Sequence, residues 1–406
     1  MIPNTVARDL KSISAFITKG ATPTTYGFNW EQSGVPFLRS ECVSSRGLDL
    51  RQAMFISPAA DAALARSRVR DGDILMTITG NVGRVAILVG LGSANINQHI
   101  ARVRVADSSF DPDFVYHYLS QPTIRAHYES ITTGQAYPQI SLTQVRSTLV
   151  PALPLPEQQA IARALTTADN YVHSIKQLIT KKRDIKLGMM QELLTGKTRL
   201  PGFSGDWHTR KIGDFTDVKA GGTPPTGIER YWGGDIRWMS SGEVHQKRVR
   251  EVVGRITRDG LTESAAQILP VGTVLMALAG QGKTRGTVAV SHVELTTNQS
   301  IAGILPSEEH DSDFLYYNLD TRYDELRGES TGDGGRGGLN LTIIKKLDVL
   351  MPDVEEQSAI AEVLAAADAE ITVLERRLES AGAVKQGMMQ ELLTGRTRLA
   401  AEGVAA

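Results

Sequence analysis

The sequence predicts an α+β protein in which two α/β segments, in a tandem pseudo-two-fold repeat, are separated by two long helices that form an antiparallel coiled coil. Three observations predict this fold class. Residues 186–200 recur almost unchanged as residues 385–399, with 13 of 15 positions identical. Apolar residues with heptad spacing precede both copies of that segment. Short apolar and β-branched runs bounded by glycine occur in the rest of each copy.

The duplication extends along the whole chain. The copies are offset by 199 residues, close to half of the 406-residue length and far outside the periods of solenoids and propellers. Upstream motifs keep their order in both copies: Gly20-Ala-Thr-Pro23 with Gly221-Gly-Thr-Pro224, Asn97-Gln98 with Asn298-Gln299, and Pro156-Glu-Gln-Gln with Glu355-Glu-Gln-Ser. We therefore expect two divergent front segments, residues 1–150 and 201–350, and two nearly invariant helical segments, residues 151–200 and 351–406.

Each front segment has the pattern of short strands followed by a short helix. Residues 73–79 and 274–279 are expected to be buried strands that end at a glycine. Residues 83–88 and 286–290 are expected to return as the second strands of hairpins. Short helices are expected at residues 113–119 and 313–319, and residues 201–207 are expected to link the two copies.

Each helical segment has a heptad seam. The seam residues are Ile161, Leu165, Ala168, Val172, Ile175 and Ile179 in the first copy, and Ile360, Leu364, Ala367, Ile371, Leu374 and Leu378 in the second. Pro156 and Pro352 stand near the helix starts, and Gly196 and Gly395 follow as stops. The first segment has eight Lys/Arg against four Asp/Glu and the second has five against ten, so opposite charges favour pairing. An antiparallel coiled coil is expected, with two helices that each pack on their own front segment as the alternative.

Composition restricts the class of protein. Hydrophobic content of 41% and charged content of 22% are ordinary for a globular chain. Cys42 is the single cysteine, which rules out an internal disulfide and suits a reducing compartment. The chain has no apolar run of membrane-spanning length, and its start is not a signal peptide, so a cytoplasmic protein without membrane contact is expected.

The net charge of −1 argues mildly against nucleic-acid binding, but basic residues cluster locally. The runs are Arg66, Arg68 and Arg70; Lys181, Lys182 and Arg183; and Lys247, Arg248, Arg250, Arg255 and Arg258. Solvated surface is the alternative interpretation of each run.

No pattern for catalysis stands out. Residues 277–284 approximate a phosphate-binding loop with Lys283 as its lysine, but β-branched residues follow instead of a helix, so a P-loop nucleotide-binding protein is a remote alternative. Residues 332–337 fit the dinucleotide fingerprint by letters alone and are expected to form a glycine loop. The eight histidines lack metal-ligand spacing, so neither a catalytic residue nor a metal or cofactor site is expected in this chain.

Polar loop residues of the front segments suit the recognition of DNA. Arginine and lysine pair with guanine, and asparagine and glutamine pair with adenine, in the major groove. The candidates for DNA binding are Ser40, Asn81, Arg84, Gln98, Tyr137 and Gln139 in the first front segment, and Ser240, Ser241, Gln281, Lys283, Arg285, Asn298, Gln299, Arg336 and Asn340 in the second. Because the Asn-Gln pair recurs while the front segments diverge, we expect it to serve the structure or to contact phosphates, not bases.

Several motifs together have a known counterpart. The most specific are residues 193–207, Leu-Leu-Thr-Gly-Lys-Thr-Arg-Leu-Pro-Gly-Phe-Ser-Gly-Asp-Trp, their partial copy at residues 392–399, and the helix openings at Pro156 and Glu355. With them the chain resembles, over essentially its full length, the specificity subunit of type I restriction–modification enzymes. The resemblance implies two target recognition domains, formed by the front segments, and a central and a distal helix in an antiparallel coiled coil.

The resemblance also implies a non-catalytic DNA-binding subunit of a larger complex. Its partners would be double-stranded DNA, two methyltransferase subunits and, for cleavage, restriction (nuclease–translocase) subunits. S-adenosylmethionine, ATP and Mg²⁺ are expected on those partner subunits. The recognition subunit of a type IIB-like enzyme remains an alternative.

A physical role follows for each segment. Each front segment would read one half of a bipartite asymmetric target, and a helix of about 58 Å, at 1.5 Å per residue, would set the spacer. The repeated helix ends would offer two equivalent surfaces to the methyltransferase subunits. The candidates for docking are Met189, Met190, Leu193 and Leu194, with Met388, Met389, Leu392 and Leu393, and packing at the ends of the coiled coil is an equal alternative.

Overall fold

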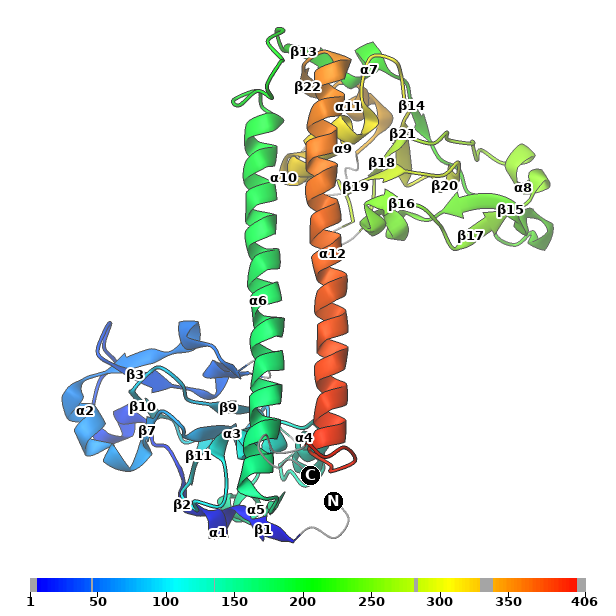
Figure 1. Ribbon diagram of the computed structural model, residues 1–406. Helices are drawn as coiled ribbons and strands as arrows, with labels where there is room; N and C mark the ends of the chain where they lie inside the picture. Colours follow the sequence, from blue (N-terminus) through cyan, green and yellow to red (C-terminus); the bar gives the residue numbers. More distant parts are fainter. Residues whose placement is uncertain (1–5, 45–46, 135, 281–283, 329–338, 400–406) are drawn as a thin grey trace, which may run out of the picture. The chain divides into compact units, whose positions relative to one another are not determined.

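The computed structural model describes residues 6–44, 47–134, 136–280, 284–328 and 339–399, which form two compact units (Figure 1). Unit 1 combines Met1–Lys176 with Arg376–Ala406, and unit 2 is Gln177–Glu375. Each unit thus contains one front segment, the beginning of the helix that follows it, and the end of the other helix. The boundaries between the two units fall inside the long helices. The boundaries between the four segments expected from the sequence fall at the starts and ends of those helices instead.

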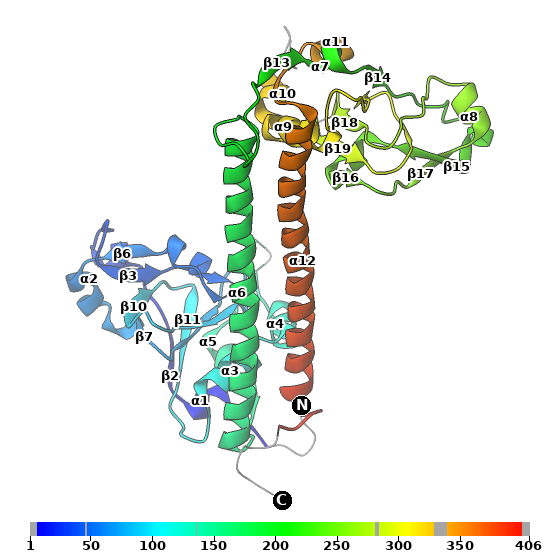
Figure 2. The same ribbon diagram turned by 45° about the horizontal axis from the view of Figure 1, so that its top comes forward.

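Unit 1 contains two four-stranded sheets, ordered β6-β3-β10-β7 and β2-β11-β8-β9, with the small pairs β1-β12 and β4-β5. Figure 2 labels the strands of the first of these sheets. The strands are β1 (Ala7–Asp9), β2 (Ser14–Lys19), β3 (Val35–Leu38), β4 (Val43–Ser44), β5 (Gly47–Leu48), β6 (Met54–Ile56), β7 (Arg68–Arg70), β8 (Ile74–Thr77), β9 (Val85–Ile87), β10 (Ser93–Ile96), β11 (Ile100–Val105) and β12 (Leu149–Pro151). The helices are α1 (Leu10–Ile13), α2 (Pro58–Ala63), α3 (Pro112–Leu119), α4 (Pro122–Ser130) and α5 (Leu142–Arg146), with the beginning of α6 (Leu155–Leu193).

Unit 2 contains a five-stranded sheet, β14-β21-β18-β19-β16, a three-stranded sheet, β17-β15-β20, and the pair β13-β22. The strands are β13 (His208–Lys211), β14 (Val218–Ala220), β15 (Trp232–Met239), β16 (Arg248–Val249), β17 (Gly254–Ile256), β18 (Val274–Ala277), β19 (Val288–Ser291), β20 (Thr296–Thr297), β21 (Ile301–Ile304) and β22 (Asp348–Met351). The helices are α7 (Ile212–Phe215), α8 (Arg258–Thr262), α9 (Ser312–Thr321), α10 (Tyr323–Gly328) and α11 (Leu341–Lys345), with the beginning of α12 (Val354–Leu392).

The two units share one topology. The order β2-β11-β8-β9 of unit 1 matches β14-β21-β18-β19 of unit 2, and β6-β3-β10 matches β17-β15-β20. Both units contain the same parallel pair, β3 with β10 and β15 with β20, and unit 2 has a second one, β16 with β19. The antiparallel pairs β8-β9 and β18-β19 confirm the two expected hairpins, and α3 and α9 confirm the two short helices. The expected α+β fold with two duplicated domains is therefore confirmed.

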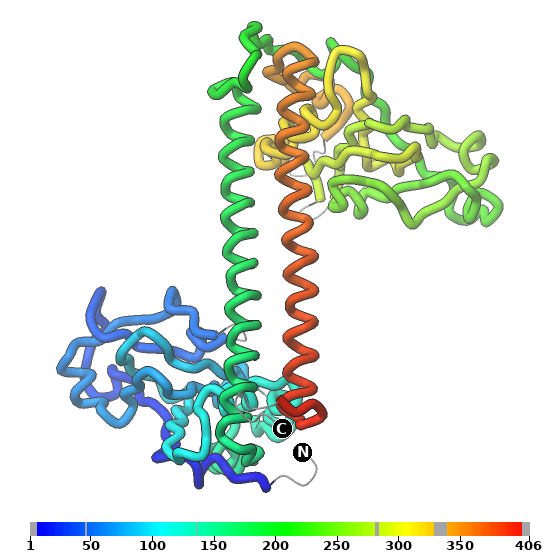
Figure 3. The backbone as a smooth tube through the Cα atoms, viewed as in Figure 1, coloured from blue at the N-terminus to red at the C-terminus, as the bar shows by residue number. Residues whose placement is uncertain are grey.

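The helices α6 and α12 each run for 39 residues without interruption and can be followed in Figure 3. In unit 2, Arg183 of α6 pairs with Glu375 of α12 at 2.5 Å. Lys186, further along α6, pairs at 2.5 Å with Asp368, which comes earlier in α12. The two helices are therefore antiparallel. The pairs of unit 1 run in the same sense and are Asp169 with Lys385 and Tyr171 with Arg377.

The heptad seam has two kinds of environment. Ile161 and Leu165 are fully buried in the main core of unit 1, and Leu364 in that of unit 2, where Ile360 is 1% exposed. The seam residues that follow lie outside those cores: Ile175, Ile179, Ile371 and Leu374 are buried, and Val172 and Leu378 are half-buried. Both expected arrangements therefore occur, because each helix packs on its own front segment first and on the other helix afterwards.

Each long helix ends at a glycine in the left-handed conformation. The φ angle is +67° at Gly196 and +71° at Gly395. A Cβ atom on Gly196 would lie 3.2 Å from the indole of Trp207, so only glycine fits this turn easily. Residues 201–207, expected to be a linker, therefore fold back over the end of α6.

Candidate nucleic-acid interface

The polar loops of unit 1 are connected to one another at the ends of strands. The Asn97 amide donates to Leu38 O, which joins the loop after β10 to the loop after β3. The Ala21 amide donates to Ile96 O, and the Ile78 amide to His99 O. The Gly80 amide donates to Pro138 O, which adds the loop around Pro138. Five stretches that are distant in sequence thus form one continuous loop surface.

Unit 2 repeats these connections. The Asn298 amide donates to Met239 O, the Gly222 amide to Thr297 O, and the Leu278 amide to Ser300 O. We call these joined loops the loop surface of each unit. It consists of residues 20–23, 39–42, 78–84, 97–99, 133–134 and 136–139 in unit 1, and of residues 221–224, 240–243, 278–280 and 298–300 in unit 2.

The described candidates for DNA binding are accessible to solvent. The exposed ones are Asn81, Tyr137, Gln139, Gln299 and Asn340, and the half-buried ones are Ser40, Arg84, Gln98, Ser240, Ser241, Arg285 and Asn298. Gln281, Lys283 and Arg336 lie outside the described residues. Some candidates have local structural roles, because Asn340 caps α11 and Asn298 Oδ1 accepts the Ser300 amide.

Most members of the basic runs are held in ion pairs. Arg68 pairs with Asp61 at 2.5 Å, and Lys247 pairs with Asp320 at 2.5 Å. The other paired members are Lys182 with Glu370, Arg183 with Glu375, Arg248 with Asp313 and Arg255 with Glu251. These pairs satisfy charge locally, while the other members of the runs, Arg66, Arg70, Lys181, Arg250 and Arg258, are exposed.

The repeated helix ends are largely interior, which favours packing at the helix ends over the docking of a partner. Met190, Leu193 and Leu194 belong to the main core of unit 2. Their counterparts Met389, Leu392 and Leu393 belong to the main core of unit 1. Met189 and Met388 are only half-buried. The heptad pattern could not distinguish these roles, because apolar residues at a helix end suit a partner and a core equally.

Two ion pairs with buried carboxylates give a structural role to repeated residues at the helix starts and in the turns that follow the helices. Glu356, at the start of α12, forms two hydrogen bonds of 2.6 Å with the Arg199 guanidinium. Glu157, at the start of α6, forms the equivalent pair with Arg398. Each helix start is therefore tied to the turn that follows the other helix. The signal was present in the sequence, because all four residues recur at the same offset.

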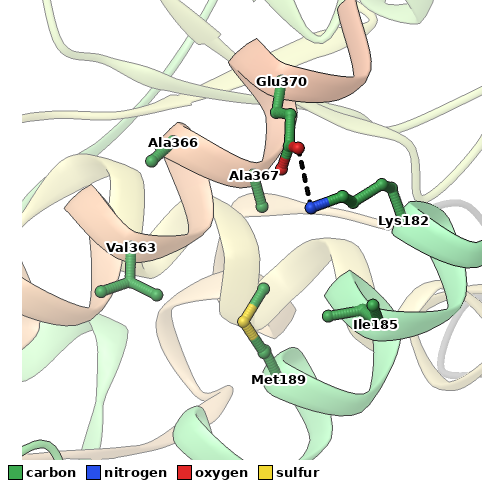
Figure 4. Close-up of a pocket in the computed structure, with 7 residues that line it drawn as sticks. All are labelled: Lys182, Ile185, Met189, Val363, Ala366, Ala367 and Glu370. Atoms are coloured by element: carbon green, nitrogen blue, oxygen red, sulfur yellow. Dashed lines mark ion pairs between the residues drawn. The ribbon is translucent and has the colours of Figure 1, made fainter. Parts of the chain in front are cut away.

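A groove between the helices of unit 2 has a volume of about 280 Å³. Its lining residues, shown in Figure 4, are Lys182, Ile185, Met189, Val363, Ala366, Ala367 and Glu370. Lys182 Nζ lies 2.7 Å from Glu370 Oε1. Ile185 is 45% exposed, and its repeat counterpart in unit 1, Val384, is 60% exposed.

A histidine stands where the front segment of unit 1 meets its helix. His117 Nε2 lies 2.9 Å from Thr166 Oγ1, and the imidazole is 2% exposed. Burial lowers the pKa of His117 to about 4. At the equivalent position of unit 2, Tyr317 donates to Asp368 at 2.7 Å. Both side chains therefore join a front segment to a helix.

The structure also bears on the nucleotide and metal patterns. β18 ends at Ala277, and the next described element is the strand β19, so the helix that a phosphate-binding loop needs does not follow. Lys283 and residues 332–337 lie outside the described residues. Within the described ranges, no group of three or more His, Cys, Asp and Glu side chains could hold a metal ion. No described helix is long and apolar enough to cross a membrane.

Comparison with known proteins decides the family. The model of the type I restriction modification DNA specificity domain matches residues 7–182 and again residues 204–381. The chain belongs to this family. Each match runs from a front segment into the helix that follows it, so the family domain is present twice, as the duplicated topology requires.

Relatives and solved structures agree with this assignment. The chain is 24% identical to a putative type I restriction enzyme MjaX specificity subunit of Methanocaldococcus jannaschii, over 97% of this chain and 93% of the relative. It is 32% identical to the MjaIX specificity subunit of the same organism over 39% of this chain and 37% of the relative. The fold is similar to a type I S subunit from M. genitalium, with a TM-score of 0.65, 14% identity and 97% of each chain covered.

Proposed function

We propose that this type I specificity subunit reads a bipartite, asymmetric DNA sequence, with one half recognised by the loop surface of each unit. One observation carries the proposal: the two units share a topology, yet the loops joined at the strand ends differ in sequence outside the repeated Gly-X-Thr-Pro and Asn-Gln segments. Two related scaffolds with different polar loops suit two different half-targets. Base edges are read by such side chains, whereas the scaffold sets their position.

The two long helices would set the spacer between the half-targets. A 39-residue helix is about 58 Å long at 1.5 Å per residue, which exceeds one turn of B-DNA, about 34 Å. The continuity of α6 and α12 supports this role, because a helix without a break transmits length rigidly. The spacer would therefore follow from the number of helical residues.

The chain would bind DNA in the cytoplasm as a non-catalytic part of a complex with two methyltransferase subunits and with restriction subunits. S-adenosylmethionine, ATP and Mg²⁺ would be bound by those partners. Ile185 and Val384 support two equivalent contacts, because they occupy the same repeat position, are both apolar and are both exposed. We propose these two places for the methyltransferase subunits, in place of the buried residues Met190, Leu193, Met389 and Leu392.

The test is to map modified bases in the genome of a host that produces the chain with its partner subunits. The proposal predicts one methylated sequence made of two specific parts and a spacer of constant length and arbitrary bases. A continuous or palindromic sequence would contradict two different half-targets. Methylation that persists without this chain would contradict its role in recognition.

A further inference from the structure

The same threonine–glutamine contact occurs in both units. Thr22 Oγ1 donates to Gln98 Oε1 in unit 1, and Thr223 Oγ1 donates to Gln299 Oε1 in unit 2. In unit 1 the pair joins the loop after β2 to the loop that carries Asn97-Gln98, and in unit 2 it joins the loop after β14 to the loop that carries Asn298-Gln299. Gln98 is half-buried and Gln299 is exposed, so both amides reach the loop surface.

The backbone builds this contact independently of the surrounding side chains. A Cβ atom on Gly20 would lie 1.9 Å from Ile96 O, and one on Gly221 would lie 2.2 Å from Asn298 O. Only glycine permits so close an approach of the two loops. The contact is thus part of the common scaffold, and it persists although the neighbouring loops have diverged.

The preceding asparagines have a different role. Asn97 Oδ1 accepts the His99 amide at 3.1 Å, and Asn298 Oδ1 accepts the Ser300 amide at 3.1 Å. Each asparagine therefore shapes the turn with its own side chain. The glutamine that follows is left to present its amide group to a ligand.

The threonine hydroxyl determines what that amide can do. It holds the glutamine oxygen toward the loop, so the NH₂ group is the part that can face a ligand. In unit 1, Gln98 Nε2 also lies 3.1 Å from His99 Nε2, which leaves one of its two N–H donors for a ligand. Reading adenine needs both ends of the amide, with the oxygen accepting from N6 and the nitrogen donating to N7. A phosphate oxygen needs only a donor, and glutamine is among the residues that contact phosphates.

We propose that Gln98 and Gln299 each donate an amide N–H to a phosphate of the DNA backbone, one in each half of the target, with Thr22 and Thr223 holding them as donors. The proposal rests on the proposed DNA-reading function. Its logic is that an asymmetric target has different bases in its two halves but the same backbone. A contact that is identical in both units, although their other loops have diverged, therefore fits the DNA backbone, which is the same in both halves of the target.

The experiment uses the full chain in its methyltransferase complex and measures binding to a duplex with the mapped target, and to duplexes with one base pair changed. Gln98→Ala should weaken binding about three- to tenfold, the value of one neutral hydrogen bond, and by the same factor on every duplex. The dependence on salt should keep its slope, because a neutral donor releases no counterion. Gln98→Glu should bind more weakly still, since its carboxylate accepts from Thr22 and faces the phosphate.

Matched variants make the result decisive. Thr22→Val should weaken binding uniformly, whereas Thr24→Val, an exposed threonine two residues away, should leave it unchanged. Gln299→Ala and Gln299→Glu repeat the test in unit 2, and thermal unfolding of each complex separates lost contact from lost folding.

A changed base preference in Gln98→Ala, or unchanged binding in both Gln98→Ala and Gln98→Glu, would overturn the inference. Failure of the proposed function is distinguishable, because the unmodified complex would then show no preference for the target over the changed duplexes.

Discussion

Glu157 and Glu356 explain, at the scale of single residues, why the helix starts and the turns after the helices recur so faithfully. Their side chains are 7% and 3% exposed, and each forms a bidentate pair with the arginine that follows the other helix. Both members must be kept, because a buried carboxylate without its guanidinium is costly. Identity between the two copies therefore reflects contacts within the chain as well as any contact with partners.

Arg199→Ala tests this explanation. The substitution leaves the Glu356 carboxylate buried without its partner, so the free energy of unfolding should fall by about 1–3 kcal/mol, as for other buried charged groups that lose a hydrogen bond. Denaturant titration measures the loss. Lys197→Ala, an exposed lysine in the same turn, should change stability by less than about 0.5 kcal/mol. Equal stability of the two variants would refute the structural role of the pair.

His117 should make stability depend on pH. Burial lowers its folded pKa to about 4, whereas the unfolded chain takes up the proton near the usual value of about 6.5. The unfolded state therefore binds more protons between these values, and stability should fall as pH is lowered from about 6.5 to 4, by about 1–2 kcal/mol at pH 5.

The matched variant for this effect is His117→Tyr, which copies Tyr317 from the other unit. It should reduce the difference in melting temperature between pH 7 and pH 5, although the buried His310, whose pKa is also lowered to about 4, keeps part of it. If the melting temperature changed equally between pH 7 and pH 5 in the variant and in the unmodified chain, His117 would be excluded as a cause of the pH dependence.

At the scale of elements, the long helices were the part most open to prediction. A heptad pattern needs only residues that are near in sequence, so the seam and both helices could be expected from Ile161 to Ile179 and from Ile360 to Leu378. The pairing of strands could not, because β3 and β10 meet across more than fifty residues of chain. The recurrence of Glu157 and Arg398 was visible in the sequence, but their pairing, across 241 positions, could not be predicted for the same reason.

The proposal that α6 and α12 set the length of the DNA spacer can be tested by lengthening both helices. Adding seven residues to each helix, after Lys176 and after Glu375, keeps the heptad register. The addition extends each helix by about 10 Å at 1.5 Å per residue, or about three base pairs of 3.4 Å. The mapped target should keep both halves and gain about three spacer positions. An unchanged spacer would show that the helices do not set it.

The exposed apolar positions of the helices test the proposed partner contacts. Ile185→Asp and Val384→Asp each place a charge on one of the two equivalent positions, while leaving the cores untouched. Each single variant should retain one methyltransferase subunit per chain, and the double variant none, as measured by the mass of the purified complex. Two bound subunits in the double variant would place the contact elsewhere.

For the whole molecule, the repeat predicted two domains but not how they are composed. The sequence suggests that each front segment folds with the helix that follows it, whereas each unit also includes the end of the other helix. Met190 and Leu193 illustrate the reason, because they complete the core of unit 2 although they precede its front segment in the chain. The candidates for DNA contact could be predicted only as a class of polar loop residues. Which of them lie on one surface depends on strands that are distant in sequence and end side by side.

The central claim, that each unit reads one half of the target, is tested most directly by changing the loop surface of one unit. Asn81→Ala and Arg84→Ala alter residues of unit 1 that have no identical counterpart in unit 2. Modified bases would be mapped in hosts that produce each variant with its partner subunits. The account predicts relaxed or altered bases in one half of the target, with the other half and the spacer unchanged. Altered bases in both halves would contradict it.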